Sequence, residues 1–229
     1  EHFRLDELTE ITDTITSFGT DMSFPESSKK TKTIRFIQEK VHDFGWFADK
    51  RFNVLKGEVK LPHSGRTVTL YTMFTNNEAH LWKNSIEYMH DAVYYYSLWN
   101  GDYPYNYCTA VDGTISAGGG MEYPMCTLIT AEGSFKGLVS VTVHESIHSW
   151  FQGILATNES KYEWMDEGFC TYAQYEVLNY LYKKNVLNHL YRQYKSYSNV
   201  AKSSYKEPLS THADFYNLNY VYGVNAYNK

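Results

Sequence analysis

The sequence predicts an α+β fold in which a β-rich N-terminal part precedes a largely helical part. Apolar and polar residues alternate with a period of two in residues 33–38 and 66–74, with a turn at Pro62-His-Ser-Gly65 between strand-like runs. Beyond residue 75 the apolar residues recur at helical spacing instead. We therefore expect a domain boundary near residue 72, with a β-domain in residues 1–72 and a second domain in residues 73–229.

The helical part has recognisable start and stop signals. Thr75-Asn-Asn-Glu78 is a capping-box pattern, in which the Thr and Glu side chains can satisfy each other's backbone donors. The helix that follows should end at Asn100-Gly101. Two short apolar runs, 107–111 and 125–130, flank a glycine-rich loop and are typical of a small sheet. Further helical patterns cover about 138–152, 162–182 and 185–198, whereas the segment 211–229 has no clear pattern.

The composition excludes several classes of function. In 229 residues, 43% are hydrophobic and 21% charged, a balance typical of ordinary folded proteins. No run approaches the roughly 20 consecutive apolar residues of a membrane-spanning helix. Twenty-one Lys and Arg against 26 Asp and Glu give a net charge of −5, the wrong sign for a nucleic-acid binder. We therefore expect neither a nucleic-acid partner nor a membrane span.

Three cysteines are too few and too scattered for a disulfide framework, so buried thiols are favoured and a Cys108–Cys126 bridge stays open. The chain begins at Glu1 without the charged and apolar regions of a signal peptide. We expect it to be a processed or excised piece. Its compartment stays open: cytoplasmic, or periplasmic or secreted if a signal peptide has been removed.

The chemistry is concentrated in His144-Glu145-Ser146-Ile147-His148, which lies inside a helical pattern. Residues four apart share one face of a helix, so both imidazoles can bind one metal ion. Glu145 lies about 100° further round the helix, where it can contact a metal-bound water without being a ligand. Glu167 follows on the next helical run and can return as a third, oxygen ligand, leaving one coordination position open.

This pattern is specific. A chain of this composition contains an HExxH sequence by chance about 0.02 times. The alternative is a helix surface with two ordinary histidines and a solvated carboxylate. The apolar flanks, with Val143, Ile147 and Trp150 among them, argue against it, because buried imidazoles and carboxylates are costly without a partner.

At these residues the chain resembles the aminopeptidase N family of zinc metallopeptidases, a gluzincin group. Val143-His-Glu-Ser-Ile-His-Ser-Trp-Phe151 followed by Glu167-Gly-Phe169 is similar to its zinc motif. Gly119-Gly-Met-Glu-Tyr123 resembles the family's Gly-x-Met-Glu-Asn sequence, and Ala226-Tyr-Asn-Lys229 resembles its Tyr-x-Lys-Gly segment. The resemblance implies the tail of an N-terminal β-domain and a thermolysin-like catalytic domain, truncated at its C-terminal end.

The resemblance also implies a role for each matching residue. His144, His148 and Glu167 would bind one Zn²⁺ per chain, which activates water and polarises the scissile carbonyl. Glu145 would act as general base and then general acid, and Tyr227 would donate a hydrogen bond to the oxyanion. The substrate-binding loop would comprise Gly119, Gly120, Met121 and Glu122.

The implied function is a zinc-dependent aminopeptidase acting on peptides with a free N-terminus, because the Glu122 carboxylate can pair with an α-ammonium group. Two alternatives stay open: a zinc endopeptidase of the same fold, and a catalytically inactive, zinc-stabilised domain. Tyr123 stands where the family usually has Asn, and Gln152-Gly153 replaces the usual Gly-Asn. We expect these departures to alter contacts on the substrate side rather than the chemistry.

Overall fold

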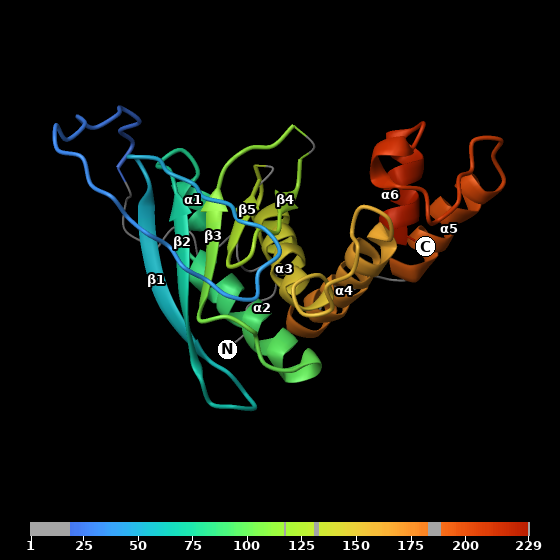
Figure 1. Ribbon diagram of the computed structural model, residues 1–229, viewed down its shortest axis with the longest axis horizontal. Coiled ribbons are helices and arrows are strands. Elements are labelled where there is room, and N and C mark those ends of the chain that lie inside the picture. Colours follow the sequence, from blue (N-terminus) through green and yellow to red (C-terminus); the bar gives the residue numbers. More distant parts are fainter. Residues whose placement is uncertain (1–18, 117, 131–132, 183–188, 229) are drawn as a thin grey trace.

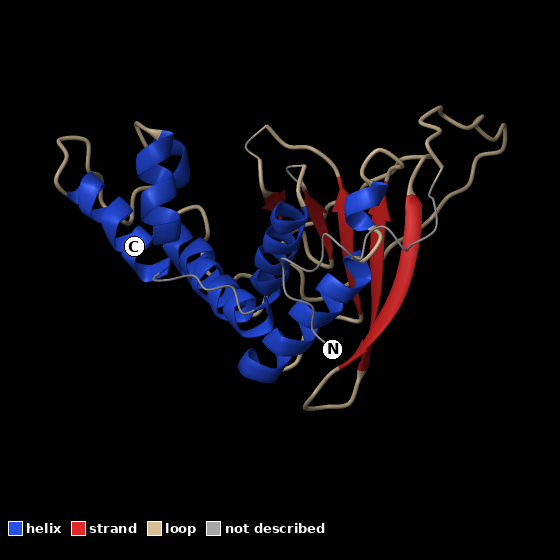
Figure 2. Ribbon diagram, turned by 180° about the vertical axis from the view of Figure 1, so that it is seen from behind, coloured by secondary structure: helices blue, strands red, loops and turns tan. Residues whose placement is uncertain are grey.

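The computed structural model describes residues 19–116, 118–130, 133–182 and 189–228 (Figure 1). A five-stranded sheet lies at one side of the molecule and the helices α5 (His189–Ala201) and α6 (Asn219–Asn228) at the other. The helices α3 (Phe135–Phe151) and α4 (Phe169–Tyr182) lie between them, as both views show (Figures 1 and 2). The predicted α+β class is confirmed.

The sheet is mixed, with the strand order β1-β2-β3-β5-β4. The hairpin of β1 (Asn53–Lys60) and β2 (Thr67–Phe74) is antiparallel, and β2 runs parallel to β3 (Tyr107–Asp112). β3 is parallel to β5 (Cys126–Ile129), which pairs with the short antiparallel strand β4 (Gly120–Met121). The edge strand β4 therefore brings the glycine-rich loop back beside α3.

The boundary expected near residue 72 falls inside β2, and β1 and β2 belong to the same sheet as β3. A division at that position would separate residues of one hydrogen-bonded strand. The division of the chain into domains stays a prediction, and the continuous sheet favours a boundary on the N-terminal side of β1.

The alternation in 66–74 reflects a sheet with one buried face. Val68, Leu70, Thr72 and Phe74 are all buried on β2, while the residues between them are partly exposed. The strand predicted in 33–38 is wrong, because that segment is extended without regular pairing and Ile34, Phe36 and Ile37 are 57–73% exposed. Alternation alone does not make a strand, since the backbone donors and acceptors also need a neighbouring strand.

The first predicted helix is divided in two. α1 (Ala79–Trp82) is followed by α2 (Ser85–Asn100), which ends before Gly101 as expected. The predicted capping box does not form: the Thr75 backbone and hydroxyl both donate to the Asp112 carboxylate on β3, and Glu78 makes no capping hydrogen bond. A long-range acceptor has replaced the local one.

The remaining helices follow the predicted order. α3 begins after Ser134, whose hydroxyl accepts a hydrogen bond from the Gly137 backbone. A π-helical turn, η2 (Trp164–Gly168), leads directly into α4, and the segment left unassigned contains a short 3₁₀ turn, η3 (Ala213–Phe215), and α6. The main core lies among the sheet, α2, α3 and α4, whereas α5 and α6 share a small cluster of three valines.

Candidate metal centre and active-site cleft

Helix α3 carries His144, Glu145 and His148 in its second half, where the helix is packed into the core. Val143 and Ile147 are fully buried on either side of the histidines. His148 is 2% exposed and Glu145 is 7% exposed, so both lie almost out of reach of bulk water. The position of these polar groups is therefore set by a helix whose neighbouring apolar side chains are fully buried.

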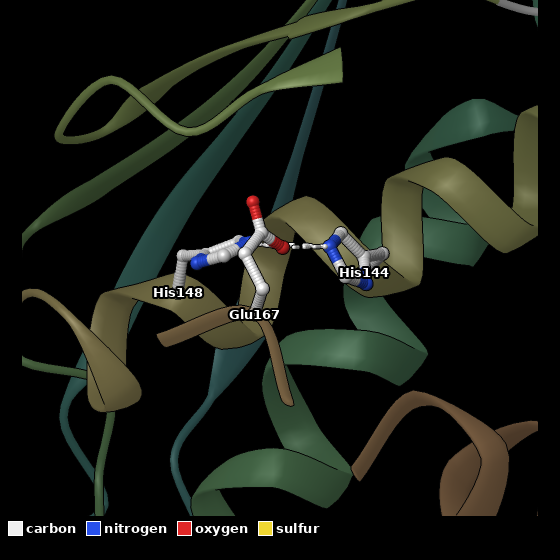
Figure 3. Close-up of side chains that lie close together, drawn as sticks. All are labelled: His144, His148 and Glu167. Atoms are coloured by element: carbon white, nitrogen blue, oxygen red, sulfur yellow. Dashed lines mark hydrogen bonds and ion pairs between the residues drawn. The ribbon is translucent and has the colours of Figure 1, made fainter. Parts of the chain in front are cut away.

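Three donor atoms converge at this point (Figure 3). His144 Nε2 lies 3.0 Å from Glu167 Oε2 and 3.2 Å from His148 Nε2, and His148 Nε2 lies 3.6 Å from Glu167 Oε2. Donors bound at about 2.0–2.2 Å to one tetrahedral zinc ion would be about 3.3–3.6 Å apart. The three distances are therefore close to those of a zinc coordination sphere. Without a bound cation, the lone pairs of the two neutral imidazole nitrogens would point at each other. The residues therefore fit a zinc ion.

Both imidazoles are oriented by hydrogen bonds to their other nitrogen. His144 Nδ1 lies 3.3 Å from Gln174 Oε1, and Gln174 is in turn held by Ser140 through two 2.8 Å hydrogen bonds. His148 Nδ1 lies 2.5 Å from Asp166 Oδ1 and 3.3 Å from Cys170 Sγ. An Nδ1–H donor leaves the Nε2 lone pair free for a metal, which is how outer residues fix the tautomer of a ligand histidine.

These orienting residues were not among the site residues predicted from the sequence. Asp166 directly precedes Glu167, and a carboxylate beside a predicted ligand is a recognisable signal. Gln174 and Cys170 offered no such signal, because only the packing of α4 against α3 places them next to the histidines.

Glu145 lies against the glycine-rich edge of the sheet. A Cβ atom at Gly120 would lie 2.6 Å from Glu145 Oε1, so the absence of a side chain there leaves room for the carboxylate. Glu145 Oε2 is buried and has no hydrogen-bond partner among the described residues. Burial raises the pKa of this carboxyl to about 7, despite the opposing effect of His144 and His148. A group of this kind is suited to proton transfer near neutral pH.

The predicted substrate loop also reaches the metal centre. Gly119 has a φ of +77°, which a residue with a side chain rarely adopts, and Gly120 and Met121 form β4. Oxygens of Glu122 and Glu145 and a ring nitrogen of His148 all lie within 4.8 Å of one another. Burial, together with Glu167 and Asp166, raises the pKa of Glu122 and outweighs the effect of His148. Glu122 therefore lies beside the donors that could hold a metal.

Tyr227 approaches the centre from α6. Its ring stacks on His144, with ring centroids 6.0 Å apart and an interplanar angle of 27°. Burial and the hydrogen-bonded Glu167 carboxylate raise the pKa of Tyr227 far above its usual value, so the phenol stays protonated. All the predicted site residues, from four separate segments of the chain, are thus brought to one place.

The predicted site residues other than the buried His148 line a cleft of about 850 Å³ between two walls. The inner wall is formed by β4, α3, η2 and α4, and it carries His144, Glu167, Glu145 and Glu122. The outer wall is formed by α5, η3 and α6, and it carries Tyr227, Tyr222 and Arg192. The cleft is large enough for several residues of a peptide.

Cys108, Cys126 and Cys170 are all free, so the Cys108–Cys126 bridge left open by the sequence does not form. Among the described residues, no helix is long and apolar enough to cross a membrane.

Comparison with known proteins agrees with this arrangement. The family model described as the peptidase family M1 domain matches residues 85–229, more than half of the chain. Aminopeptidase B from Rattus norvegicus and from Homo sapiens are each 42% identical over 67 residues, which is 28% of this chain and 10% of the relative. The matched part is thus a small share of these curated relatives.

Solved structures share the fold. An M1 zinc metallopeptidase from Deinococcus radiodurans aligns with a TM-score of 0.53 and 17% identity. A mutant of a two-domain M1 zinc metallopeptidase bound to L-arginine aligns with a TM-score of 0.52 and 16% identity. Each match covers 77% of this chain and 38% of the other. The chain belongs to peptidase family M1, a family of zinc metallopeptidases, and the resemblance to the aminopeptidase N-like gluzincins is confirmed.

Proposed function

We propose that this chain binds one Zn²⁺ through His144, His148 and Glu167, and that the protein containing it is an aminopeptidase acting on peptides with a free N-terminus. One observation carries the proposal: three donor atoms at the spacing of a zinc coordination sphere lie beside Glu122 and Glu145 in a single cleft. The aligned regions are 10% of aminopeptidase B and 38% of the solved structures, so the activity of the whole protein is part of the proposal.

A bound zinc ion supplies a Lewis acid that polarises the scissile carbonyl and activates a water molecule for attack. Glu145 would take a proton from the attacking water and then give it to the leaving amine, and its Oε2 has no hydrogen-bond partner among the described residues. Its raised pKa supports both halves of this transfer, because the group gains and loses a proton near neutral pH. Gly120 keeps the carboxylate within reach, since a side chain there would occupy its space.

Tyr227 donates its phenol hydrogen to the oxyanion that develops on the scissile carbonyl. The ring is held against His144, and its raised pKa keeps the hydroxyl protonated. A preorganised donor of this kind contributes about 3 kcal/mol to transition-state stabilisation.

Glu122 binds the α-ammonium group of the substrate and thereby selects the N-terminal peptide bond. Its carboxylate lies next to the candidate metal donors, with an oxygen within 4.8 Å of a ring nitrogen of His148 and an oxygen of Glu145. The charge of an α-ammonium would also stabilise the ionised form of this buried carboxyl, whose pKa is raised in its absence. The related structure that contains L-arginine holds a molecule with a free α-amino group, which is consistent with such a site.

Zinc-dependent hydrolysis of aminoacyl-p-nitroanilides, compared with their N-acetylated forms, tests this function in both this chain and the full-length protein. Cleavage of the free-amine substrates alone supports the aminopeptidase. Equal cleavage of both sets would favour the endopeptidase and leave Glu122 without a role in specificity. Zinc binding without cleavage of either set by the full-length protein would favour the inactive, zinc-stabilised domain.

A further inference from the structure

The N-terminal segment 40–47 packs against the inner wall of the cleft, and none of its residues takes part in the proposed mechanism. The segment passes in front of the strands in Figure 1, and the Lys40 carbonyl accepts a 3.3 Å hydrogen bond from the Tyr105 hydroxyl. Further along, His42 Nε2 lies 3.2 Å from the carbonyl oxygen of Gly153, just beyond the C-terminal end of α3. The segment is therefore attached to the helix that carries two of the predicted metal donors.

The same segment contacts Tyr123, which directly follows Glu122 in the predicted substrate loop. A Cβ atom at Gly45 would lie 2.6 Å from Cγ of the Tyr123 ring, so only glycine leaves room for the ring in this position. Phe47 packs on the same ring, with ring centroids 6.0 Å apart and an interplanar angle of 57°. The Tyr123 ring is thus held by the backbone of Gly45 and the side chain of Phe47.

Tyr123 and Gly153 belong to the two departures from the family's motifs, and both contact the 40–47 segment. Residues 118–122 line the cleft, whereas Tyr123 is not among the described residues that do. The aromatic ring at this position therefore adds no wall to the cleft. Its effect on a substrate has to pass through the neighbouring Glu122.

The backbone on both sides determines where Glu122 lies. On one side, Met121 belongs to β4, and its carbonyl accepts a 3.1 Å hydrogen bond from the Thr127 hydroxyl. On the other side, the Tyr123 carbonyl accepts a 3.0 Å hydrogen bond from the Cys126 backbone N–H. A carboxylate that binds a substrate cation has to be held in place before the substrate arrives, because a displacement of about 1 Å is costly.

We propose that Tyr123 is a positioning residue for Glu122. The 40–47 segment holds the Tyr123 ring through Gly45 and Phe47, and the ring keeps the Glu122 carboxylate where it binds the α-ammonium group. The contacts described for the Tyr123 side chain are made by its ring, so the hydroxyl is not needed for this role. This inference rests on the proposed aminopeptidase function, because it concerns the same carboxylate.

The test uses the zinc-loaded full-length protein and two readouts. Steady-state kinetics on a free-amine aminoacyl-p-nitroanilide gives kcat and KM, and calorimetry compares the binding of L-arginine with that of Nα-acetyl-L-arginine. In Tyr123→Ala, both kcat/KM and the preference for the free amine should fall by at least about tenfold, with most of the kinetic loss in KM. Tyr123→Phe keeps the ring and should behave like the parent protein.

The contribution of the N-terminal segment is measured with one substitution at two positions. Phe47→Ala removes part of the support of the ring and should lower the free-amine preference in the same direction as Tyr123→Ala. The matched control is Phe44→Ala in the same segment, where the 67% exposed side chain should contribute nothing. If Phe47 acts through the Tyr123 ring, adding Phe47→Ala to Tyr123→Ala should cause no further loss of preference.

Zinc content and thermal unfolding distinguish positioning from a purely structural role. All variants should retain one zinc ion per chain, because none of the substituted residues is a predicted ligand. Tyr123→Ala should melt lower than the parent protein, since packing around the ring is lost. The ratio of the two arginine affinities is measured on the folded protein, so a loss of stability alone does not change it.

A free-amine preference that Tyr123→Ala leaves intact overturns the positioning role alone, and so does an equal loss in Phe44→Ala and Phe47→Ala. A parent protein that binds both arginine compounds equally and cleaves free and N-acetylated substrates equally refutes the proposed function and the role of Tyr123 with it. A parent protein that binds L-arginine selectively but hydrolyses nothing refutes the activity, and a loss of that selectivity in Tyr123→Ala then still supports the positioning role.

Discussion

The two walls of the cleft are built in different ways. The inner wall belongs to the main core, and its helix α3 buries Val139, Val143 and Ile147 completely. The outer wall buries a cluster of three residues, Val200, Val221 and Val224. Polar contacts also hold this wall together. The side chain of Asn225 is 1% exposed, and its amide nitrogen lies 3.2–3.5 Å from the Glu207 and Pro208 carbonyls and the Tyr216 hydroxyl.

The chemistry is divided along the same line. The predicted metal donors His144, His148 and Glu167 lie together at the inner wall (Figure 3), and the proposed general base Glu145 lies beside them on α3. Tyr227, Tyr222 and Arg192 face them from the outer wall. A metal site tolerates little displacement of its ligands, whereas a wall with few buried contacts can open and close at low cost. We therefore expect the inner wall to determine metal binding and proton transfer, and the outer wall to affect substrate contacts and transition-state stabilisation.

The largest effect is expected at the inner wall from Glu145→Gln. It removes the proton acceptor while keeping the shape of the side chain, so kcat should fall by about 10³-fold or more. Zinc content, measured by atomic emission, should stay at one ion per chain, because Glu145 is not a ligand. A variant that retained a tenth of the activity would show that another group accepts the proton.

Tyr227→Phe tests the contribution of the outer wall to the same reaction. The ring can still stack on His144, but the oxyanion loses its donor, and kcat should fall by about 10²–10³-fold with a small change in KM. Steady-state kinetics on a free-amine p-nitroanilide measures both constants. If KM rose and kcat did not change, Tyr227 would contact the substrate in its ground state and the assigned role would be wrong.

Asp166→Asn tests whether the Asp166 carboxylate orients His148 for metal binding. A neutral amide is a weaker acceptor for His148 Nδ1–H, so zinc affinity should fall by about 10–100-fold in competition with a chelator. Asp214→Asn, on the 82% exposed Asp214 of η3, is the matched control on the outer wall and should leave zinc affinity unchanged. Equal zinc affinity in the two variants would indicate that the packing of α3 alone positions His148.

The smallest effects are expected from a Val→Ala substitution made once in the main core and once in the valine cluster of the outer wall. Val139→Ala should destabilise the protein by about 2–3 kcal/mol, because the fully buried site on α3 cannot collapse around the lost methyl groups. Val224→Ala, on α6, should cost about 1 kcal/mol, because its small cluster can relax. Urea unfolding measures both values. Equal losses would mean that the outer wall is as tightly packed as the inner wall.

Much of the candidate site could be predicted from the sequence because it depends on local geometry. Helical periodicity places His144 and His148 on one face with Glu145 beside them, whatever the rest of the fold. The glycine positions before Glu122 likewise indicated a close approach of the backbone, and Gly119 and Gly120 both have the geometry that requires glycine.

Tertiary contacts decided what the local pattern left open or predicted wrongly. Residues 33–38 alternate like a strand and are not one, and Thr75 bonds to Asp112 instead of capping its own helix. The orienting partners of the two histidines, Gln174 and Asp166, come from segments 30 and 18 residues away. That Glu145 Oε2 has no partner among the described residues is equally a property of the folded chain.

By itself, the sequence determined the fold class, the zinc-peptidase family and the pair of histidines that can bind one metal ion, because a helix fixes the relative positions of residues within one turn. Only the tertiary structure decided which nitrogen of each histidine is free, which strand pairs form and which buried carboxylate lacks a partner. Those properties depend on hydrogen bonds between segments that are distant in the sequence. A polar group without a partner costs little free energy in water but much more when it is buried, and only the tertiary structure shows which groups are buried.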